Sequence, residues 1–447
     1  MLTKFIGDRK FLRTLIFLAL PIMLQDLMSH SVNFMDVWMM GQISDEAVTG
    51  VGLSKRLFFL YVLLIFGVNS GGAIFMGQYW GKGEIKGIHR VLGIVFVTNI
   101  ILACVFAGIA LFAPRWFMSI LSQDPLVIEQ GVQYLAVASL IYLLTSISFT
   151  IIIALRAIRQ TKIPMFASAC SLVVKLAANY YFIFVLDMGV VGAAWGTVFA
   201  RATEITVQII LIRSFRLPIF TRIRQHFAFD FGYVKSFFKT TLPVIGNEFF
   251  WSLGIFMYDV AYRFTGTMGQ GAFHISDNIQ HFFMIAGISI GAASAVTIAN
   301  HLGAGEREEA IDSARKCVNI GFGVALLMGV LMFTIGPIIV GTYDSVSAYV
   351  QGLASTNLAV ISLFMIPRTI NYFYIISILR QGGDTMYCLI LDVGFVWLVG
   401  IPLAFLGAFV LGWPIYMVLA LVYVEETIKF FVVRARVRKN NWANKLV

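Results

Sequence analysis

Long apolar runs fill most of the chain, and short polar stretches separate them. We distinguish twelve runs, at approximately residues 12–40, 51–77, 91–113, 130–155, 163–186, 189–212, 236–262, 272–299, 315–340, 349–379, 386–410 and 413–433. A helix crosses the roughly 30 Å of hydrocarbon in a bilayer with about 20 residues, so each run is long enough. Because a helix pairs its own backbone groups inside lipid, the pattern predicts an all-α integral membrane protein with twelve transmembrane helices.

Three short segments recur in the same order in the second half of the chain. They are LALPIMLQD (18–26) with TTLPVIGNE (240–248), GQYWGKGE (77–84) with ANHLGAGE (299–306), and LRAIRQT (155–161) with LRQGGDT (379–385). The offset is 222 residues for the first two pairs and 224 for the third, which indicates an internal duplication. We therefore expect two six-helix bundles, an N-lobe of residues 1–222 and a C-lobe of residues 223–447, that join within the polar connector 213–235.

Charged residues are few and unevenly placed. They make up 13% of the chain, against about 25% in soluble domains. Most of the 33 Lys and Arg residues lie at the N-terminus, in every second connector or in the C-terminal tail. Positive charge marks the cytoplasmic side, so both termini are predicted to be cytoplasmic and the number of spans to be even. Each half then enters the membrane the same way, which predicts lobes related by a pseudo-two-fold axis along the membrane normal.

Several classes of function do not fit this pattern. The basic residues follow the connectors of a membrane protein, so nucleic acid is not an expected partner. The cysteines are scattered singly (Cys104, Cys170, Cys317 and Cys388), which indicates neither a disulfide framework nor a metal site. The six histidines form no His-x₃-His pair, and the sequence has no nucleotide-binding loop, so we do not expect an enzyme or an ATP-driven pump.

Ionisable residues inside the apolar runs are candidates for function, because a charge at the bilayer centre costs at least about 2.5–3.5 kcal/mol. They are Asp26, Asp36, Lys175, Arg201, Glu204, Glu248, Asp259, Arg368, Asp392, Glu425 and Glu426. Asp36 ends a polar stripe that Gln25, Ser29 and Asn33 form at helical spacing. Lipid does not tolerate such a stripe, so we expect it to face protein or a water-filled cavity.

Some of these charges have a partner one helical turn away. Arg201 precedes Glu204 by three residues, and Lys429 follows Glu425 by four and Glu426 by three. A structural ion pair is therefore the simpler alternative to a functional site at both places.

Several motifs together resemble those of a known family. They are LALP (18–21), FMDVWMMGQ (34–42), the helix ends GQYWGKGE and ANHLGAGE, NYYFIF (179–184), GVVGAAWGT (189–197) and LRQGGDT. In this order the chain resembles, over nearly its whole length, the multidrug and toxin extrusion (MATE) family of cation-coupled efflux transporters. The resemblance implies two six-helix lobes around a central cavity, and export of amphipathic, often cationic compounds driven by inward H⁺ or Na⁺.

The same resemblance implies roles for particular residues. Asp36 matches the family's N-lobe acid and Asn179 the asparagine of the fifth helix, so H⁺ or Na⁺ is expected at this pair. Some members carry a second acid four residues beyond the asparagine, and Ile183 occupies that place here. Glu248 lies on helix seven, where other members have a functional carboxylate, and the duplication places Asp26 at the equivalent position of the first helix.

Three further residues complete the predicted site. Asn33 lies one turn before the N-lobe acid, and Lys175 lies one turn before the helix-five asparagine, where it is a candidate partner for an acid. Arg368 follows Pro367, whose missing N–H frees a backbone carbonyl that can serve as a ligand. Arg368 is also the expected partner of Glu248 if that acid proves to be structural.

The favoured function is secondary efflux of amphipathic or cationic small molecules by antiport with H⁺ or Na⁺ through alternating access. A flippase for lipid-linked oligosaccharides, from the related superfamily, is the alternative, and it calls for many basic residues in the cavity to hold pyrophosphate. A membrane-embedded enzyme is a third. We expect no cofactor beyond the coupling ion, drugs or lipophilic cations as substrates, membrane lipids as surroundings, a monomer, and a location in the bacterial cytoplasmic membrane.

Overall fold

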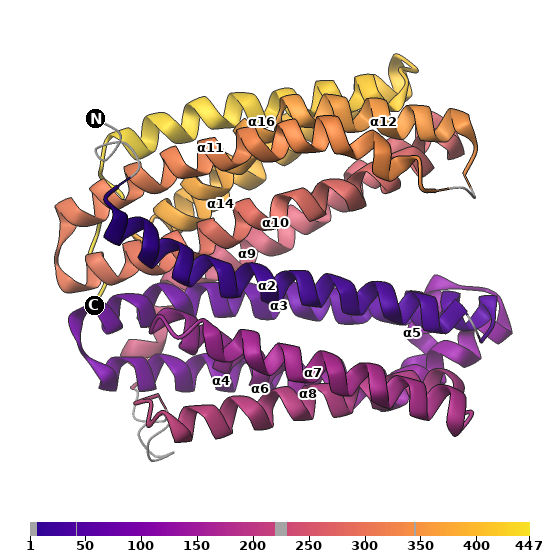
Figure 1. The fold of residues 1–447 in the computed structure, drawn as a ribbon, viewed down its shortest axis with the longest axis horizontal. Coiled ribbons are helices and arrows are strands. Elements are labelled where there is room, and N and C mark those ends of the chain that lie inside the picture. Colours follow the sequence, from indigo (N-terminus) through magenta and orange to yellow (C-terminus); the bar gives the residue numbers. More distant parts are fainter. Residues whose placement is uncertain (1–6, 42, 220–229, 344–345) are drawn as a thin grey trace. The chain divides into compact units, whose positions relative to one another are not determined.

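The computed structural model describes residues 7–41, 43–219, 230–343 and 346–447, without the side chains of residues 33, 34, 37, 38, 41 and 45. Helices make up nearly all of this part of the chain (Figure 1). Those of the first half are α2 (Arg9–Gly41), α3 (Asp45–Lys82), α4 (Ile85–Phe112), α5 (Pro114–Leu121), α6 (Pro125–Ala157), α7 (Lys162–Tyr180), η1 (Tyr181–Val185) and α8 (Gly189–Ser214). Those of the second half are α9 (Phe231–Tyr262), η3 (Arg263–Thr265), α10 (Gly266–Ala304), α11 (Arg307–Val340), α12 (Ala348–Leu363), α13 (Met365–Tyr372), η4 (Phe373–Leu379), α14 (Thr385–Phe395), η5 (Val396–Gly400), α15 (Ile401–Phe405), η6 (Leu406–Val410) and α16 (Ile415–Arg438).

The predicted fold class is confirmed. Each of the twelve apolar runs coincides with one helix or with consecutive helical segments. By length and hydropathy, nine described stretches qualify as membrane spans, and ten do so when the bent pair Ala348–Leu363 and Met365–Leu379 counts as one. One of the nine, Phe231–Ala304, contains both α9 and α10, and the charged helix α16 is not among them. The structure is therefore consistent with twelve crossings.

The chain divides into two compact units. We call Leu24–Ile245 the N unit, and Met1–Met23 together with Gly246–Val447 the C unit. The boundaries lie inside α2 and α9, two residues after Pro21 and Pro243. Each unit therefore includes the beginning of a helix whose remainder belongs to the other, and the two boundaries are related by the same offset as the sequence repeat.

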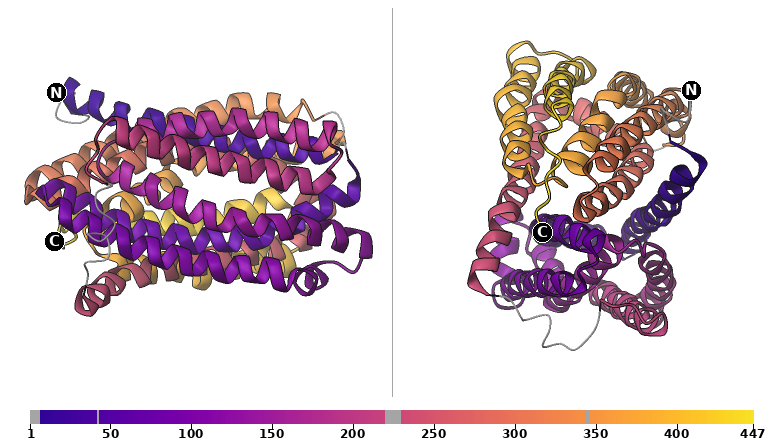
Figure 2. Two further views of the ribbon diagram at one scale, coloured as in Figure 1. Left: turned by 90° about the horizontal axis from the view of Figure 1, so that it is seen from below. Right: turned by 90° about the vertical axis from the view of Figure 1, so that its left-hand side faces the viewer.

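Within the N unit, α6 packs against α3, α4 and α8, and α7 packs against α8. The right-hand view of Figure 2 looks roughly along the helices of each unit. The rings of Tyr61 and Tyr142 lie 5.1 Å apart in the buried interior, and the Tyr61 hydroxyl donates to the Tyr142 carbonyl oxygen at 2.7 Å. Tyrosines suit this position because each ring is buried while the hydroxyl finds a partner.

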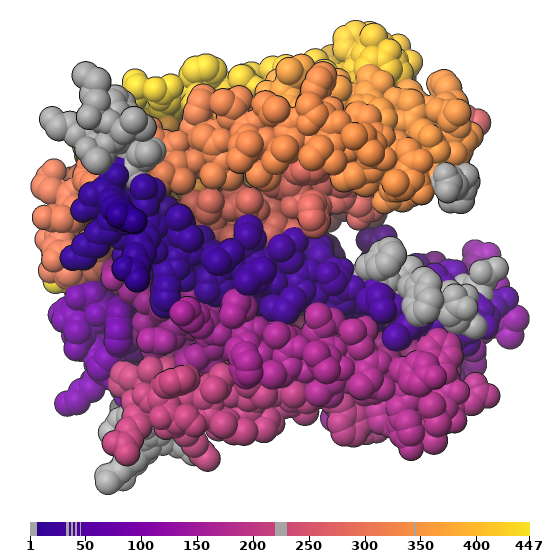
Figure 3. All heavy atoms as spheres, viewed as in Figure 1, coloured from indigo at the N-terminus to yellow at the C-terminus, as the bar shows by residue number. Residues whose placement is uncertain are grey.

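Within the C unit, α10, α11 and α12 pack against one another, and α12 packs against α16. The start of α2 joins this unit through Leu15 and Leu18, which pack with Cys317 and Phe373. Helices α11 and α12 (orange) lie side by side on the surface that Figure 3 shows. The exposed side of α11 carries apolar side chains such as Phe333, as expected of a face that contacts lipid.

The duplicated Gly-x-Gly segments end helices, as the sequence predicts. Gly83 follows α3 and Gly305 follows α10, with φ of 76° and 83°. This left-handed conformation favours glycine, and in each case the glycine N–H bonds a carbonyl of the last helical turn.

Two helices differ from the simple apolar pattern. Helix α11 begins at Arg307, whereas the apolar run begins near residue 315, because its polar first turns carry Glu308 and Glu309 at the positive end of the helix dipole. The long run 349–379 is bent by 57° between α12 and α13. Pro367 lies in the first turn of α13, where it cannot donate to the carbonyl four residues earlier, so the predicted proline break is present.

Candidate functional site

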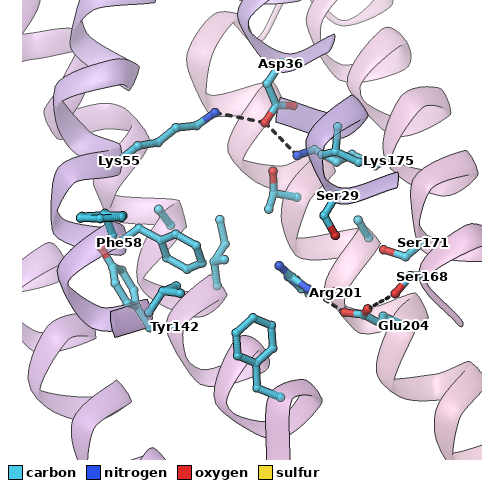
Figure 4. Close-up of a pocket in the computed structure, with 18 of the residues that line it drawn as sticks. Ser29, Asp36, Lys55, Phe58, Tyr142, Ser168, Ser171, Lys175, Arg201 and Glu204 are labelled. Carbon is cyan, nitrogen blue, oxygen red and sulfur yellow. Dashed lines mark hydrogen bonds and ion pairs between the residues drawn. The ribbon is translucent and has the colours of Figure 1, made fainter. Parts of the chain in front are cut away.

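Asp36, on α2, is buried in the N unit between two lysines (Figure 4). Its Oδ2 atom accepts from Lys175 Nζ at 2.8 Å and from Lys55 Nζ at 3.2 Å. Its Oδ1 atom accepts from Asn179 Nδ2 at 3.3 Å. The carboxylate is thus held by two ammonium groups and an amide, which is a more basic surrounding than a site for a metal cation requires.

The helices place these groups by simple periodicity. Lys175 and Asn179 lie one turn apart on α7 and face α2, and Lys55 reaches the same carboxylate from α3. Helix α8 approaches closely at Gly196, where a Cβ atom would overlap Asn179 Oδ1. That oxygen is buried and has no hydrogen-bond partner among the described residues.

The structure thus brings Asp36, Asn179 and Lys175 together. The side chain of Asn33 lies outside the described part of the chain. The sequence analysis did not include Lys55 among the candidates, although residue 55 lies near the beginning of the apolar run 51–77. Helix α3 spans Asp45–Lys82, and Lys55 reaches the Asp36 carboxylate from its third turn.

A second charged cluster lies deeper in the N unit. Glu204 accepts from Arg201 at 2.7 Å, and from Ser148 and Ser168 at 2.8 Å each. Gln25 Nε2 in turn donates to Ser168 Oγ at 3.0 Å. The ion pair one turn apart that the sequence offered as an alternative is therefore present at Arg201 and Glu204.

One pocket of about 670 Å³ extends between the two clusters (Figure 4). Its volume is that of sites for drug-sized molecules. Apolar and aromatic side chains form much of the wall, among them Phe58, Val62, Tyr142 and Phe149. The charged lining residues are Asp36, Lys55, Arg56, Lys175, Arg201 and Glu204.

In the C unit, Glu248 is not part of an open acidic site. Its Oε1 atom lies 2.7 Å from Arg380 Nη1 in an ion pair, and Arg380 Nη2 donates to Asn247. The alternative partner Arg368 was therefore wrong: Arg368 donates to the Tyr423 hydroxyl at 2.6 Å. Arg380 lies just beyond the apolar run 349–379 and was not among the predicted site residues, yet the structure buries it at 1% exposure.

The network continues to a lysine that contacts three carboxylates. Lys429 Nζ lies 3.1 Å from Asp392, 3.0 Å from Glu425 and 3.2 Å from Glu426. The lysine side chain is 2% exposed. Asn371 donates to Glu426 at 2.6 Å. A single buried ammonium group therefore contacts three carboxylates, and the buried guanidinium groups of Arg368 and Arg380 lie close enough to attract Glu426 and Asp392.

The duplication also appears in the contacts. Asp26 lies 3.9 Å from Arg156 in the N unit, at positions equivalent to Glu248 and Arg380 in the C unit. The Asp26 pair is more open, with side chains 32% and 22% exposed. The acid on the first helix of each half thus contacts the arginine at the end of its fourth membrane helix.

No described group of three or more His, Cys, Asp or Glu residues has the arrangement of a metal site. The four cysteines are free thiols. A metal centre built from side chains alone is therefore not visible in the described ranges.

Comparisons with known proteins point to one family. The sequence model of the MatE family matches residues 21–181 and 243–406. The "Uncharacterized transporter YisQ" of Bacillus subtilis is 21% identical over 443 residues, covering 98% of this chain and 96% of that protein. The "Probable multidrug resistance protein NorM" of Thermotoga maritima is 21% identical, covering 88% of this chain and 85% of its own.

Solved structures agree on the fold. A MATE protein crystallised in complex with MaL6 superposes with a TM-score of 0.87 at 17% identity, covering 98% of both chains. The outward-facing conformation of a multidrug resistance MATE family transporter of the MOP superfamily has the same TM-score at 16% identity and the same coverage. With the family match over most of its length and the fold in common, the chain belongs to the MatE family of transporters.

Proposed function

We propose that the protein is a secondary efflux transporter that exports amphipathic small molecules by alternating access, coupled to the inward movement of H⁺ or Na⁺. The observation that carries the proposal is the pocket of about 670 Å³ inside a membrane-spanning bundle, with apolar walls and charged groups at separate places. Such a pocket suits a molecule with an apolar body and a polar or charged group.

The carboxylates around Lys429 are the strongest candidates for the coupling cation. Three carboxylates share contacts with one buried ammonium group, in a medium where desolvating a carboxylate is costly. A proton or Na⁺ that binds to this cluster neutralises one carboxylate and so lowers the desolvation cost. When the cation is released to water, the cost returns. Binding of the cation is thereby linked to whether the cluster is closed or hydrated.

A coupling role for Asp36 stays a prediction, and its two lysines restrict the form it can take. A Na⁺ ion at Asp36 and Asn179 has to displace ammonium groups that already contact the carboxylate. Exchange of the lysine contacts for a proton is the simpler route. Glu248, held by Arg380, fits the structural role better than that of a second coupling acid.

A flippase for lipid-linked oligosaccharides is the second candidate, and one observation favours it. The pocket has four basic lining residues and two acidic ones, and a basic cavity is what pyrophosphate binding calls for. We rank it second because the pocket volume is that of a drug-sized ligand and the Thermotoga maritima relative is named a probable multidrug resistance protein.

The decisive experiment is transport by purified protein in liposomes under separately imposed H⁺ and Na⁺ gradients. We expect efflux of amphipathic dyes that depends on at least one gradient and that Glu425→Gln uncouples from it. Transport that ignores both gradients contradicts the coupling. Movement of a lipid-linked pyrophosphate without dye efflux supports the flippase.

The proposed topology places the protein in the bacterial cytoplasmic membrane with both termini in the cytoplasm. Single cysteines in a background without the four native ones provide the test. Cysteines at Lys82 and Arg213 should react with a membrane-impermeant maleimide only after permeabilisation, whereas those at Arg115 and Arg263 should react in intact cells. Reaction of Lys82 and Arg213 positions on opposite sides would contradict the topology.

A further inference from the structure

The charges that line the N-unit pocket do not balance. Four are basic and two are acidic, namely Lys55, Arg56, Lys175 and Arg201 against Asp36 and Glu204. In a pocket within a membrane bundle, the effective dielectric constant is low and such an excess acts strongly on a charged ligand. The sign of the excess therefore bears on which molecules the pocket selects.

Both acids already have their partners. Asp36 is contacted by Lys175 and Lys55, and Asn179 donates to its other oxygen. Glu204 is held by Arg201 and by two serine hydroxyls. A cationic ligand would have to break a buried ion pair to reach either carboxylate, which costs about 3–5 kcal/mol when the remaining charge stays buried.

The basic groups, by contrast, keep unused capacity. Arg56 is exposed and lines the pocket, and no described residue forms an ion pair with it. Lys55 shares the Asp36 carboxylate with Lys175, and its side chain is 33% exposed. An ammonium group has three donors and a guanidinium five, so these side chains can accept an anionic group without losing their present contacts.

The rest of the wall suits an apolar body. Phe58, Tyr142 and Phe149 line the pocket, and the Arg201 guanidinium lies 5.7 Å from the centre of the Phe149 ring. Flat rings next to cationic groups suit a ligand that joins an aromatic or aliphatic body to a negative charge.

We propose that the N-unit pocket selects amphipathic anions, bearing a carboxylate, sulfonate or phosphate, over cations of the same size. Arg56 and Lys55 are the residues that attract the anionic group, and Phe58 and Phe149 contact the apolar body. The proposal rests on the proposed function, because it names the substrate class of the same transporter. It replaces the cationic preference expected from the sequence.

Two dyes with the same tetraethylrhodamine core provide the test. Sulforhodamine B carries a net negative charge and rhodamine B ethyl ester a net positive one. Fluorescence polarisation of each dye against purified protein in detergent should show saturable binding of sulforhodamine B that is at least about fivefold tighter. Equal affinity, tighter binding of the cation, or no saturable binding of sulforhodamine B overturns the inference.

Substitutions locate the selectivity. Arg56→Gln should weaken sulforhodamine B at least about fivefold, the effect of one charge in a partly hydrated pocket, without weakening the cation. Lys55→Gln should act in the same direction. The matched control is Arg115→Gln, an exposed arginine of the same unit that pairs with Glu129 and does not line the pocket. An equal effect of Arg115→Gln would show that general surface charge, not the pocket, attracts the anion.

The anionic group could belong to a free molecule or to a lipid headgroup, and competition separates the two. Displacement of sulforhodamine B by dihexanoyl phosphatidylglycerol but not by dihexanoyl phosphatidylcholine supports a lipid source, and displacement by neither supports a free organic anion. Displacement by both lipids alike contradicts charge selection. Selective anion binding without gradient-driven efflux contradicts the proposed function alone, whereas gradient-driven efflux that prefers the cationic dye contradicts this inference alone.

Discussion

The excess of carboxylates around Lys429 makes a prediction that distinguishes it from an ordinary ion pair. We expect Glu425→Gln to leave the folded state equally or more stable, although it removes a partner of a buried lysine. Glu248→Gln, in the same network, should destabilise the protein. Both glutamates are buried, but Glu425 shares its lysine with two other carboxylates, whereas Glu248 pairs with Arg380.

The structure gives the magnitudes. At an effective dielectric constant of about 20, the attraction between Glu425 and Lys429 at 3.0 Å is about 5.5 kcal/mol. The oxygens of Asp392 and Glu426 that share this lysine lie no farther than about 6 Å from that of Glu425, so each repels it by at least about 2.7 kcal/mol. The two repulsions cancel the attraction. The cost of desolvating the Glu425 carboxylate then has no compensation, and a neutral side chain removes it.

Glu248 stands in the opposite situation. It forms a one-to-one contact with Arg380 at 2.7 Å, and the arginine side chain is 2% exposed. Its removal leaves a buried guanidinium group without its anion, at a cost of about 3–5 kcal/mol. Thermal unfolding of the purified variants in detergent at neutral pH measures both effects as a shift in Tm.

Two outcomes decide the matter. A Tm at or above that of the unsubstituted protein for Glu425→Gln, with a clear fall for Glu248→Gln, supports a cluster that takes up a cation. A fall of the same size in both variants would show that Glu425 is a structural partner of Lys429, and the reasoning from charge balance would be wrong. Lys429→Met should lower Tm in either case, and so confirms that the assay detects loss of a buried charge.

Two further predictions concern the N unit. Asp36→Asn should abolish gradient-driven export in liposomes and lower Tm, because it leaves two ammonium groups without their anion. Adding Lys175→Met to this variant should recover Tm but not export. Recovery of export in the double variant would exclude a coupling role for Asp36. Gly196→Ala should lower Tm, because the added Cβ atom overlaps Asn179. The control is Gly108→Ala, whose Cβ atom meets nothing within 4 Å and which should be neutral or stabilising by up to about 1 kcal/mol. Equal Tm values for the two variants would contradict the close approach of α8 to α7.

The architecture could be predicted because it follows from local patterns. Length and apolarity identify a membrane helix without knowledge of its neighbours, and the proline break in the tenth run has a local steric cause at Pro367. The ends of the helices were less accurate, because apolarity marks only the part in lipid. The polar first turns of α11 and the beginning of α3 lie outside that signal.

The candidate site was harder to predict, because its chemistry depends on partners that are distant in the sequence. The sequence around a buried acid does not show whether lysines from other helices contact its carboxylate. Neither Lys55 nor Arg380 was a candidate in the sequence analysis. Yet Lys55 contacts Asp36 on another helix, and Arg380 contacts Glu248, more than a hundred residues earlier in the chain. Lys175 was found as a candidate because its spacing from Asn179 fixed which face of the helix it shares.

The duplication explains which charges belong to the scaffold and which to the site. The acid–arginine pair of Glu248 and Arg380 recurs in the N unit, so both halves use it, as expected of a contact that holds the fold. Asp36 has no such counterpart, since Tyr258 stands 222 residues later. At the offset of 224 that holds in the later part of each half, Ile205 stands where the equivalent of Lys429 would be. The charges that diverge between the halves are those that make one pocket basic and one cluster acidic. A duplicated scaffold with unequal charges is what the proposed anionic substrate and coupling cation require, because a symmetric pair of lobes would offer both the same surroundings.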